Sequence, residues 1–269
     1  MDFDTSNIII ENDLNGLLEE RLANYVGHFY CTEGSCVIKF NEKELVFSQG
    51  DCMIITVPSM VSRIEPGEGF KTKAIYTSMP FLESCAPRNN YAIKGTLWLY
   101  VDPIWHLNES EKKICQHNFQ QVEERLADTD HAFHRDLMMS VVQTFFLDFY
   151  NFQVRIYGNN DIKEQQSSLM MRFIDMLRNG EYRKHRELSY FTDKLCVTPK
   201  YLSEVSKKTS GFSANYWINR FTIIEINRLL KNRSLSFVEI SEMFNFSSPA
   251  YFSRYVQNYL GESPSAHRQ

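Results

Sequence analysis

No stretch of the 269-residue chain approaches the roughly 18 consecutive apolar residues that a membrane-spanning helix needs. The first four residues are Met-Asp-Phe-Asp, and this acidic start lacks the features of a secretory signal or a transit peptide. The sequence also contains no glycine-rich loop of the kind that cradles phosphates, and no pattern that pairs a nucleophile with a base. We therefore expect a cytoplasmic protein that does not enter a membrane.

The cysteines are few and lack a C-x-x-C pair. Structural zinc sites need closely spaced ligands, and a disulfide framework is typical of small secreted domains. We therefore expect all six thiols to be reduced and to serve as small apolar side chains, although Cys31 and Cys36 could meet across a hairpin. The six are Cys31, Cys36, Cys52, Cys85, Cys115 and Cys196.

Basic residues are in the minority in the first part of the chain and acidic residues in the second, and the two imbalances nearly cancel to a net charge of −4. Residues 1–167 hold 14 Lys and Arg against 24 Asp and Glu, whereas residues 168–269 hold 15 against 9. A basic segment attached to an acidic one favours a polyanion as the partner of the C-terminal part. The length is sufficient for two domains, each with its own core.

The N-terminal half begins with short segments rich in β-branched and aromatic residues. Turn formers such as Glu33-Gly34 and Pro66-Gly67 separate them, and this spacing predicts a small barrel or sandwich. The predicted strands cover residues 26–31, 35–40, 45–47, 52–57 and 70–77.

Helical spacing of apolar residues follows, over residues 109–126 and 131–152. The stripe from Met138 to Phe152 suits a core face, and it would also suit a dimer seam. We expect an α+β chain with an N-terminal domain over 1–158, in which helices occupy about 109–157. A polar linker over 159–167 and an all-helical domain over 168–269 complete the predicted organisation.

Two segments of the C-terminal part repeat at an offset of 50 residues without a gap. Pro199–Gly211 reads PKYLSEVSKKTSG, and Pro249–Gly261 reads PAYFSRYVQNYLG. Each follows a short amphipathic segment and a brief turn, and in the second turn Asn245 suits a left-handed conformation. The repeat predicts two helix-turn-helix units, over about 187–210 and about 236–260.

Periodicity divides the second helix of each unit into two faces. Leu202 and Val205 should point inward in the first unit, as should Phe252, Tyr255 and Val256 in the second. The other face suits the major groove of double-stranded DNA, where Arg can recognise guanine, Gln adenine and Glu cytosine. Its residues are Lys200, Ser203, Glu204 and Lys207 in the first unit, and Ala250, Ser253, Arg254 and Gln257 in the second.

A long helix between the units, from about Ser213 to Lys231, sets their separation. About 19 residues give roughly 28 Å, while successive major-groove faces lie about 34 Å apart. A rigid connector of this length would present both recognition helices to one side of the duplex.

The C-terminal hundred residues resemble the AraC/XylS family of bacterial regulators. The resemblance implies a domain of about seven helices, whose third and sixth enter adjacent major grooves, and it adds Pro249 to the base-facing set. Asn245 departs from the family, which usually has Gly there. Thr192, Ile226 and Ser241 stand where the family usually has Ala, and His267 stands where it usually has an aromatic residue. The matching stretches are Asp193–Ser203, Lys207–Gly211, Glu239-Ile240, Phe246–Arg254, Gly261, Ser263-Pro264 and Arg268.

The N-terminal half is similar to the cupin-like β-barrel that many members of this family carry, and Phe47–Pro58 resembles a cupin strand-turn-strand segment. The histidine pair of metal-binding cupins is absent. His28 stands alone, and we interpret it as an ordinary strand residue. We therefore expect no metal and no cofactor.

These features distinguish three candidate functions. A cupin-like enzyme with an appended DNA-binding domain would need metal ligands, and a repair protein with a cysteine acceptor would need a clustered cysteine–zinc site. We expect instead a regulator that binds specific DNA sequences and has no enzymatic activity. The resemblance implies an activator, with double-stranded DNA, RNA polymerase and a second copy of the chain as partners. Whether a small-molecule effector exists stays open.

Overall fold

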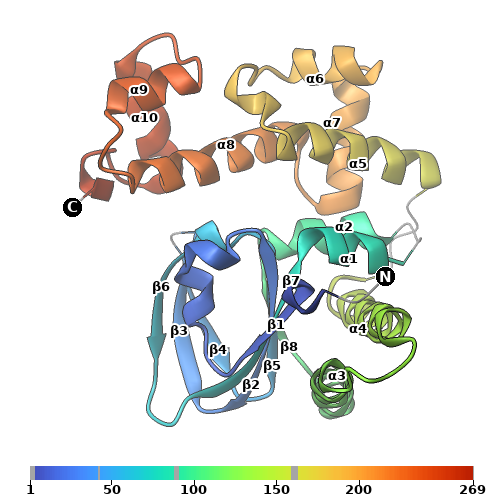
Figure 1. Cartoon of the computed structure of the whole chain (residues 1–269). Coiled ribbons are helices and arrows are strands. Elements are labelled where there is room, and N and C mark those ends of the chain that lie inside the picture. Colours follow the sequence, from blue (N-terminus) through green and yellow to red (C-terminus); the bar gives the residue numbers. More distant parts are fainter. Residues whose placement is uncertain (1–3, 42, 88–90, 159–162, 269) are drawn as a thin grey trace. The chain divides into compact units, whose positions relative to one another are not determined.

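The computed structural model describes residues 4–41, 43–87, 91–158 and 163–268. It divides into two compact units, residues 1–160 and residues 161–269, which we call the N-terminal unit and the C-terminal unit (Figure 1). The first four residues of the predicted linker, 159–162, lie outside the described residues. The prediction was wrong for residues 164–167, which form the first turn of helix α5 (Glu164–Arg178), because Ser167 is buried on the inner face of that helix.

The strands of the N-terminal unit pair antiparallel in two sheets. One sheet has the order β1-β7-β2-β5-β8 and the other the order β4-β3-β6. Within the described residues no strand pair joins the two sheets. The strands are β1 (Ile8–Glu11), β2 (Tyr25–Glu33), β3 (Ser35–Phe40), β4 (Lys43–Ser48), β5 (Asp51–Ile55), β6 (Val61–Pro66), β7 (Lys71–Ser78) and β8 (Ile104–His106).

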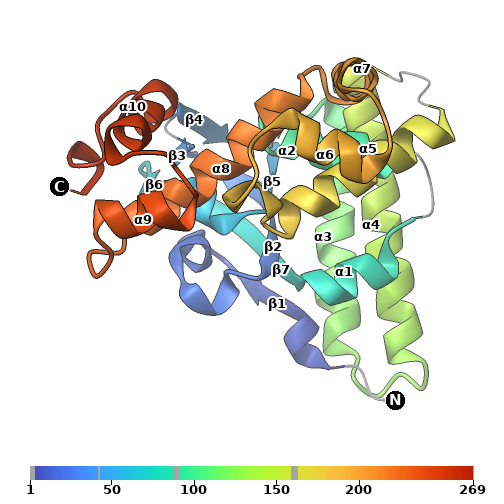
Figure 2. The same ribbon diagram turned by 90° about the horizontal axis from the view of Figure 1, so that it is seen from above.

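Helices cover one face of the larger sheet. Tyr30, Ile54 and Trp105 belong to one core with Phe119 and Phe149. Neighbouring residues along β2 and β5 point to the opposite face of the sheet, and these side chains are buried too. Because both faces are covered, every residue of β5 is buried. Figures 1 and 2 both show α3 and α4 side by side. The helices of this unit are α1 (Met79–Cys85), α2 (Tyr91–Leu99), α3 (Glu109–Ala127) and α4 (His134–Tyr157).

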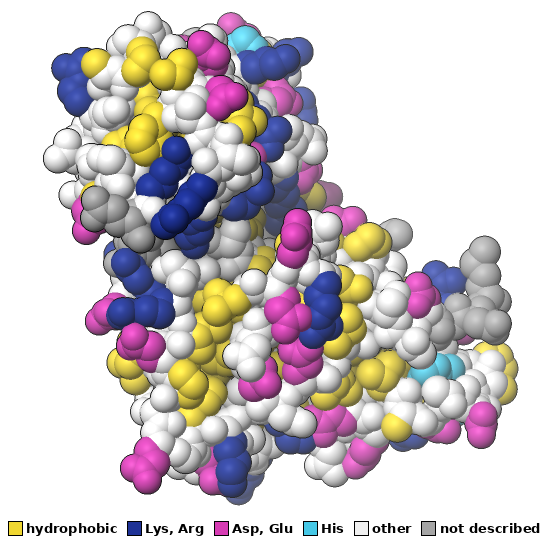
Figure 3. Space-filling model, turned by 60° about the vertical axis from the view of Figure 1, so that its left-hand side comes forward, with side chains coloured by type: hydrophobic (Ala, Val, Ile, Leu, Met, Phe, Trp, Pro, Cys, Tyr) yellow, Lys and Arg dark blue, Asp and Glu magenta, His cyan; other side chains and the backbone are white. Residues whose placement is uncertain are grey.

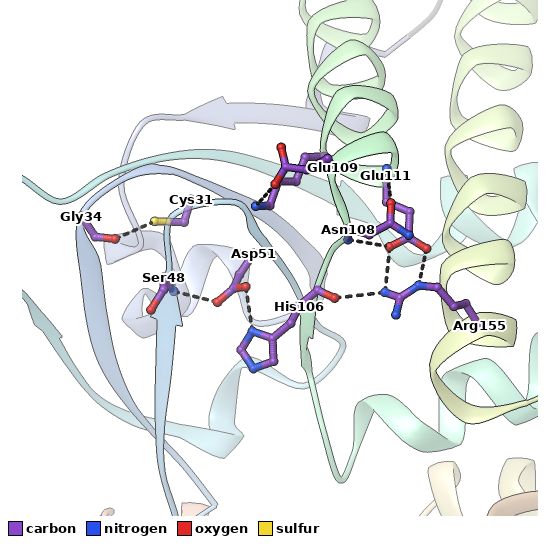
Figure 4. Close-up of polar contacts among 10 residues, drawn as sticks. Cys31, Gly34, Ser48, Asp51, His106, Asn108, Glu109, Glu111 and Arg155 are labelled. Carbon is purple, nitrogen blue, oxygen red and sulfur yellow. Dashed lines mark hydrogen bonds and ion pairs between the residues drawn. The ribbon is translucent and has the colours of Figure 1, made fainter.

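A polar network joins these helices to the last strand of the larger sheet (Figure 4). Arg155 of α4 donates to the two carboxylate oxygens of Glu111 in α3, at 2.6 and 2.7 Å, and to the carbonyl oxygen of His106 in β8, at 3.0 Å. The Nδ1 atom of His106 lies 2.8 Å from a carboxylate oxygen of Asp51 in β5. Glu111 also completes a capping box with Asn108 at the start of α3. The network therefore fixes the α3–α4 pair to the sheet edge.

The C-terminal unit is helical throughout, as the sequence predicts. Within its described part there are six α-helices rather than about seven, because the closing segment Ala266–Arg268 forms only a 3₁₀ turn. The connector α8 has 17 residues, which gives a length of roughly 26 Å. Besides α5, the helices are α6 (Leu188–Leu195), α7 (Pro199–Ser210), α8 (Ala214–Leu230), α9 (Phe237–Met243) and α10 (Pro249–Leu260).

Candidate DNA interface

The first helix-turn-helix unit consists of α6, a tight turn and α7. Cys196 ends α6 in the left-handed conformation, with φ of 56°, and the next amide, that of Val197, donates to Thr192 O at 3.0 Å. Thr198 then caps α7, because its hydroxyl accepts a hydrogen bond from the amide of Tyr201 at 3.2 Å. Pro199 occupies the first helical position, where its missing N–H costs nothing.

The second unit, α9 and α10, repeats this chemistry. Asn245 takes the left-handed conformation with φ of 51°, as predicted, and the amide of Phe246 donates to Ser241 O at 3.0 Å. The hydroxyl of Ser248 accepts from the amide of Tyr251 at 3.1 Å, and a proline again follows the cap. The left-handed residues are 49 positions apart and the caps 50, so the second turn is longer by one residue.

The left-handed turn also corrects one expectation about the cysteines. All six are free, but Cys196 is exposed, while the other five are buried. It does not fill a core, because the residue that reverses the chain direction at the turn projects its side chain into solvent. The left-handed conformation usually favours Gly or Asn, so a cysteine at this position could not be anticipated from composition.

Both recognition helices bury the residues that the sequence assigns to the core. Leu202 and Val205 are buried in α7, and Phe252, Tyr255 and Val256 are buried in α10. The predicted base-facing residues lie on the remaining surface of these two helices. Lys200, Glu204, Lys207, Pro249, Ala250, Arg254 and Gln257 are exposed, and Ser203 and Ser253 are half-buried.

The charged side chains of this surface are available for a ligand. Within the described residues, Lys200, Lys207 and Arg254 have no ion-pair or hydrogen-bond partner. Lys208, one position beyond Lys207, instead donates to the side chain of Gln166 in α5 at 3.1 Å. Figure 3 shows Lys and Arg side chains gathered on the displayed face of the C-terminal unit, in agreement with the excess of basic residues after position 168.

Two tyrosines of this surface were not among the predicted contacts. Tyr201 and Tyr251 occupy the same position in the two repeats and are 40% and 45% exposed. Their coincidence in the aligned repeat was the signal that could have identified them. Tyr251 also borders a groove of ≈ 540 Å³ between α8 and α10. The residues that line this groove are Asn219, Tyr251, Arg254, Tyr255, Asn258 and Tyr259.

Both recognition helices are anchored on α8. Trp217 of α8 is fully buried and donates through its indole N–H to the hydroxyl of Ser210, at the end of α7, at 2.8 Å. The hydroxyl of Tyr255 in α10 donates to the side-chain oxygen of Asn219 in α8 at 2.9 Å. The connector therefore holds each recognition helix by a specific hydrogen bond as well as by apolar contact.

The N-terminal unit offers no comparable site in its described part. His28 is a buried strand residue, as predicted, and its ring packs against Phe145 and Phe149 of α4 at centroid distances of 5.4 and 6.1 Å. Among the described residues, no three His, Cys, Asp or Glu side chains are grouped so that they could hold a metal ion. No described helix combines the length and the apolar character that crossing a bilayer requires.

Comparison with known proteins gives a match in the C-terminal unit. A family model described as a helix-turn-helix domain matches residues 191–269. The Msm operon regulatory protein of Streptococcus mutans is 27% identical over 109 residues, which are 39% of each chain. The regulatory protein PocR of Salmonella typhimurium is 27% identical over 99 residues, which are 37% of this chain and 31% of PocR. The matches therefore span less than two fifths of the length of these relatives.

Among solved structures, the chain is similar to ToxT from Vibrio cholerae O395. The identity is 15% and the TM-score 0.47, over 99% of this chain and 94% of that one. The AraC-like transcriptional activator CuxR is 12% identical, with a TM-score of 0.36 over 86% and 79% of the two chains. The match of the helix-turn-helix model and the two curated relatives agree with the duplicated geometry described above. The segment from residue 191 to residue 269 therefore matches the helix-turn-helix domain family, and the chain is similar to two bacterial regulatory proteins over only part of its length.

Proposed function

We propose that this chain is a transcriptional regulator that binds specific DNA sequences through α7 and α10, with each helix in one of two successive major grooves. The observation that carries the proposal is the duplicated unit. Two helices with equivalent caps, each preceded by a left-handed turn, leave a polar stripe exposed, and one connector joins them. AraC-family regulators are not enzymes, so the proposed role requires no catalytic site.

We further propose that the N-terminal unit controls the activity of the C-terminal unit. The N-terminal unit would sense an effector or a partner and would dimerise, and the protein would act in the cytoplasm as an activator in contact with RNA polymerase. The acidic character of residues 1–167 supports this division of labour, because it keeps the first unit away from DNA while the basic unit binds.

The test is selection of duplexes by the full chain from a random pool, followed by measurement of affinity against salt. A specific regulator enriches one sequence with two separated half-sites. With the two unpaired lysines Lys200 and Lys207 on phosphates, raising salt from 50 to 200 mM should weaken binding by about twelvefold or more. If no sequence is enriched and the affinity is the same for every duplex, the proposal is wrong.

Arg254→Ala tests base reading directly. Because the Arg254 guanidinium is exposed on α10 and has no partner within the described residues, it is free to donate two hydrogen bonds to a guanine. The substitution should cost about 1–3 kcal/mol of binding free energy on the selected duplex and relax one base position. Arg172→Ala, which removes one exposed charge from α5, is the matched control and should leave the preferred sequence unchanged. An equal loss on all sequences would assign Arg254 to phosphate instead.

A further inference from the structure

The segment between α5 and α6 reaches across the C-terminal unit to the turn of the second helix-turn-helix. The guanidinium of Arg186 donates to the carbonyl oxygens of Phe244 and of Asn245, the latter at 3.3 Å. Its central carbon lies 3.9 Å from the centroid of the Phe246 ring. The side-chain amide of Asn245 donates in return to the carbonyl oxygen of Lys184 at 3.3 Å. Three consecutive residues of the turn are thus contacted by one segment 58 or more positions earlier.

The same segment is attached to the middle of α8. The hydroxyl of Tyr182 donates to a carboxylate oxygen of Glu225 at 2.6 Å, and Arg183 donates to the same oxygen at 2.8 Å. Burial raises the pKa of Glu225, but the hydrogen bonds from Arg183 and Tyr182 outweigh it, so the pKa is lowered overall and the carboxylate is charged at neutral pH. The ring of Tyr182 also stacks on Phe244, with centroids 6.3 Å apart. Residues 182–186 therefore bridge the connector and the second turn.

We propose that residues 182–186 are a latch that fixes the orientation of the second helix-turn-helix unit relative to the first, and so sets the half-site spacing that the protein accepts. Arg186 and Asn245 are its positioning residues, and the part of the inference that concerns spacing rests on the proposed function. Leu188, two residues after Arg186, begins α6, so the latch is continuous with the first unit. Without it, the second unit would depend mainly on its contacts with α8.

The identity of residue 245 supports this role. Its backbone is left-handed, with φ of 51°, a conformation that glycine adopts at no steric cost. The turn alone would therefore be served better by glycine. An asparagine adds the amide that donates to Lys184 O. Asparagine therefore tolerates the left-handed backbone and adds a contact to the latch that glycine would lack.

The first experiment uses the full chain and the duplex that the wild type selects from a random pool. Variants of that duplex carry one base pair more or one fewer between the half-sites. Arg186→Ala should bind the original duplex about tenfold more weakly, because two hydrogen bonds to a charged group and a cation–π contact are lost. It should also lose most of the discrimination against the respaced duplexes. Asn245→Gly should shift both quantities in the same direction by less, and Arg172→Ala should shift neither spacing preference nor half-site choice.

The second experiment needs no DNA. Spin labels at Glu204→Cys and Gln257→Cys, in a Cys196→Ser background, report the distance between α7 and α10 in the full chain. Arg186→Ala should broaden this distance distribution, while Arg172→Ala should leave it unchanged. Arg186→Lys keeps the charge but cannot contact both carbonyls at once, and it should give an intermediate width.

The outcomes separate the two proposals. If Arg186→Ala keeps both the wild-type distance distribution and the wild-type spacing preference, the latch is wrong. If the wild type selects no duplex but the distribution broadens in the variant, the latch holds as a structural device and the proposed function fails. Should Arg186→Ala not fold, Arg186→Lys and Asn245→Gly report the same two quantities, and unchanged values in both would overturn the latch.

Discussion

Replacing Trp217 by alanine should destabilise the C-terminal unit by about 3–5 kcal/mol, the range for removal of a fully buried large aromatic side chain. Trp217 is 0% exposed, and its ring meets those of Phe212 and Tyr216 edge to face, with centroids 6.0 and 5.2 Å apart. Its indole N–H also reaches the hydroxyl of Ser210 at the end of α7. The substitution therefore opens a cavity and detaches the first recognition helix from its connector.

The measurement is urea unfolding of the full chain. Circular dichroism monitors the transition, because the substitution removes a fluorophore. Trp217→Phe keeps most of the apolar volume and loses the N–H donor, and it should cost considerably less. The Ser210 hydroxyl already donates to the carbonyl oxygen of Ser206 at 2.8 Å, so the loss of the indole donor should not leave it without a partner. Met171→Ala, at a side chain 43% exposed on α5, is the control for a surface truncation. A loss below about 1 kcal/mol for Trp217→Ala would contradict the anchoring role.

Sequence reasoning succeeded where the signals are local. Each recognition helix begins with a Thr or Ser cap and a proline at the first helical position, and it ends at a glycine. Each of these residues determines the backbone conformation only of its near neighbours in the chain. The inward residues Leu202 and Phe252 follow from helical periodicity for the same reason. Local chemistry of this kind is sufficient to predict the two helix-turn-helix units almost to the residue.

Sequence reasoning failed where structure depends on contacts between distant segments. β8 has only three residues and is a strand because it pairs with β5, about 50 positions earlier in the chain. β6 carries polar residues at several positions, because it lies at the edge of the smaller sheet, where little of it is buried. The contact of Arg186 with the second turn has no periodic signature at all. The latch is therefore evident only in the three-dimensional structure.

The buried histidine of the N-terminal unit should make the chain sensitive to acid. His28 in β2 is 3% exposed, and burial lowers the pKa of its imidazole to about 4, although a hydrogen bond at the Ile75 backbone opposes the shift. The unfolded chain binds this proton with a pKa of about 6.5. The folded state excludes it until the pH falls to about 4, so stability is complete above pH 6.5 and declines as the pH falls between the two values.

Between these limits the wild type should lose about 2 kcal/mol of unfolding free energy by pH 5 and about 3 kcal/mol by pH 4 through His28 alone. His28→Leu, which cannot accept a proton and has a similar volume, should remove that part of the pH dependence. His117→Asn, at an exposed position of α3, should retain it. The readout is the unfolding transition of residues 1–160 in the full chain at pH 8 and at pH 5. A His28→Leu variant that loses as much stability as the wild type between these pH values would show that imidazole burial beside Phe145 and Phe149 is not the origin of the sensitivity.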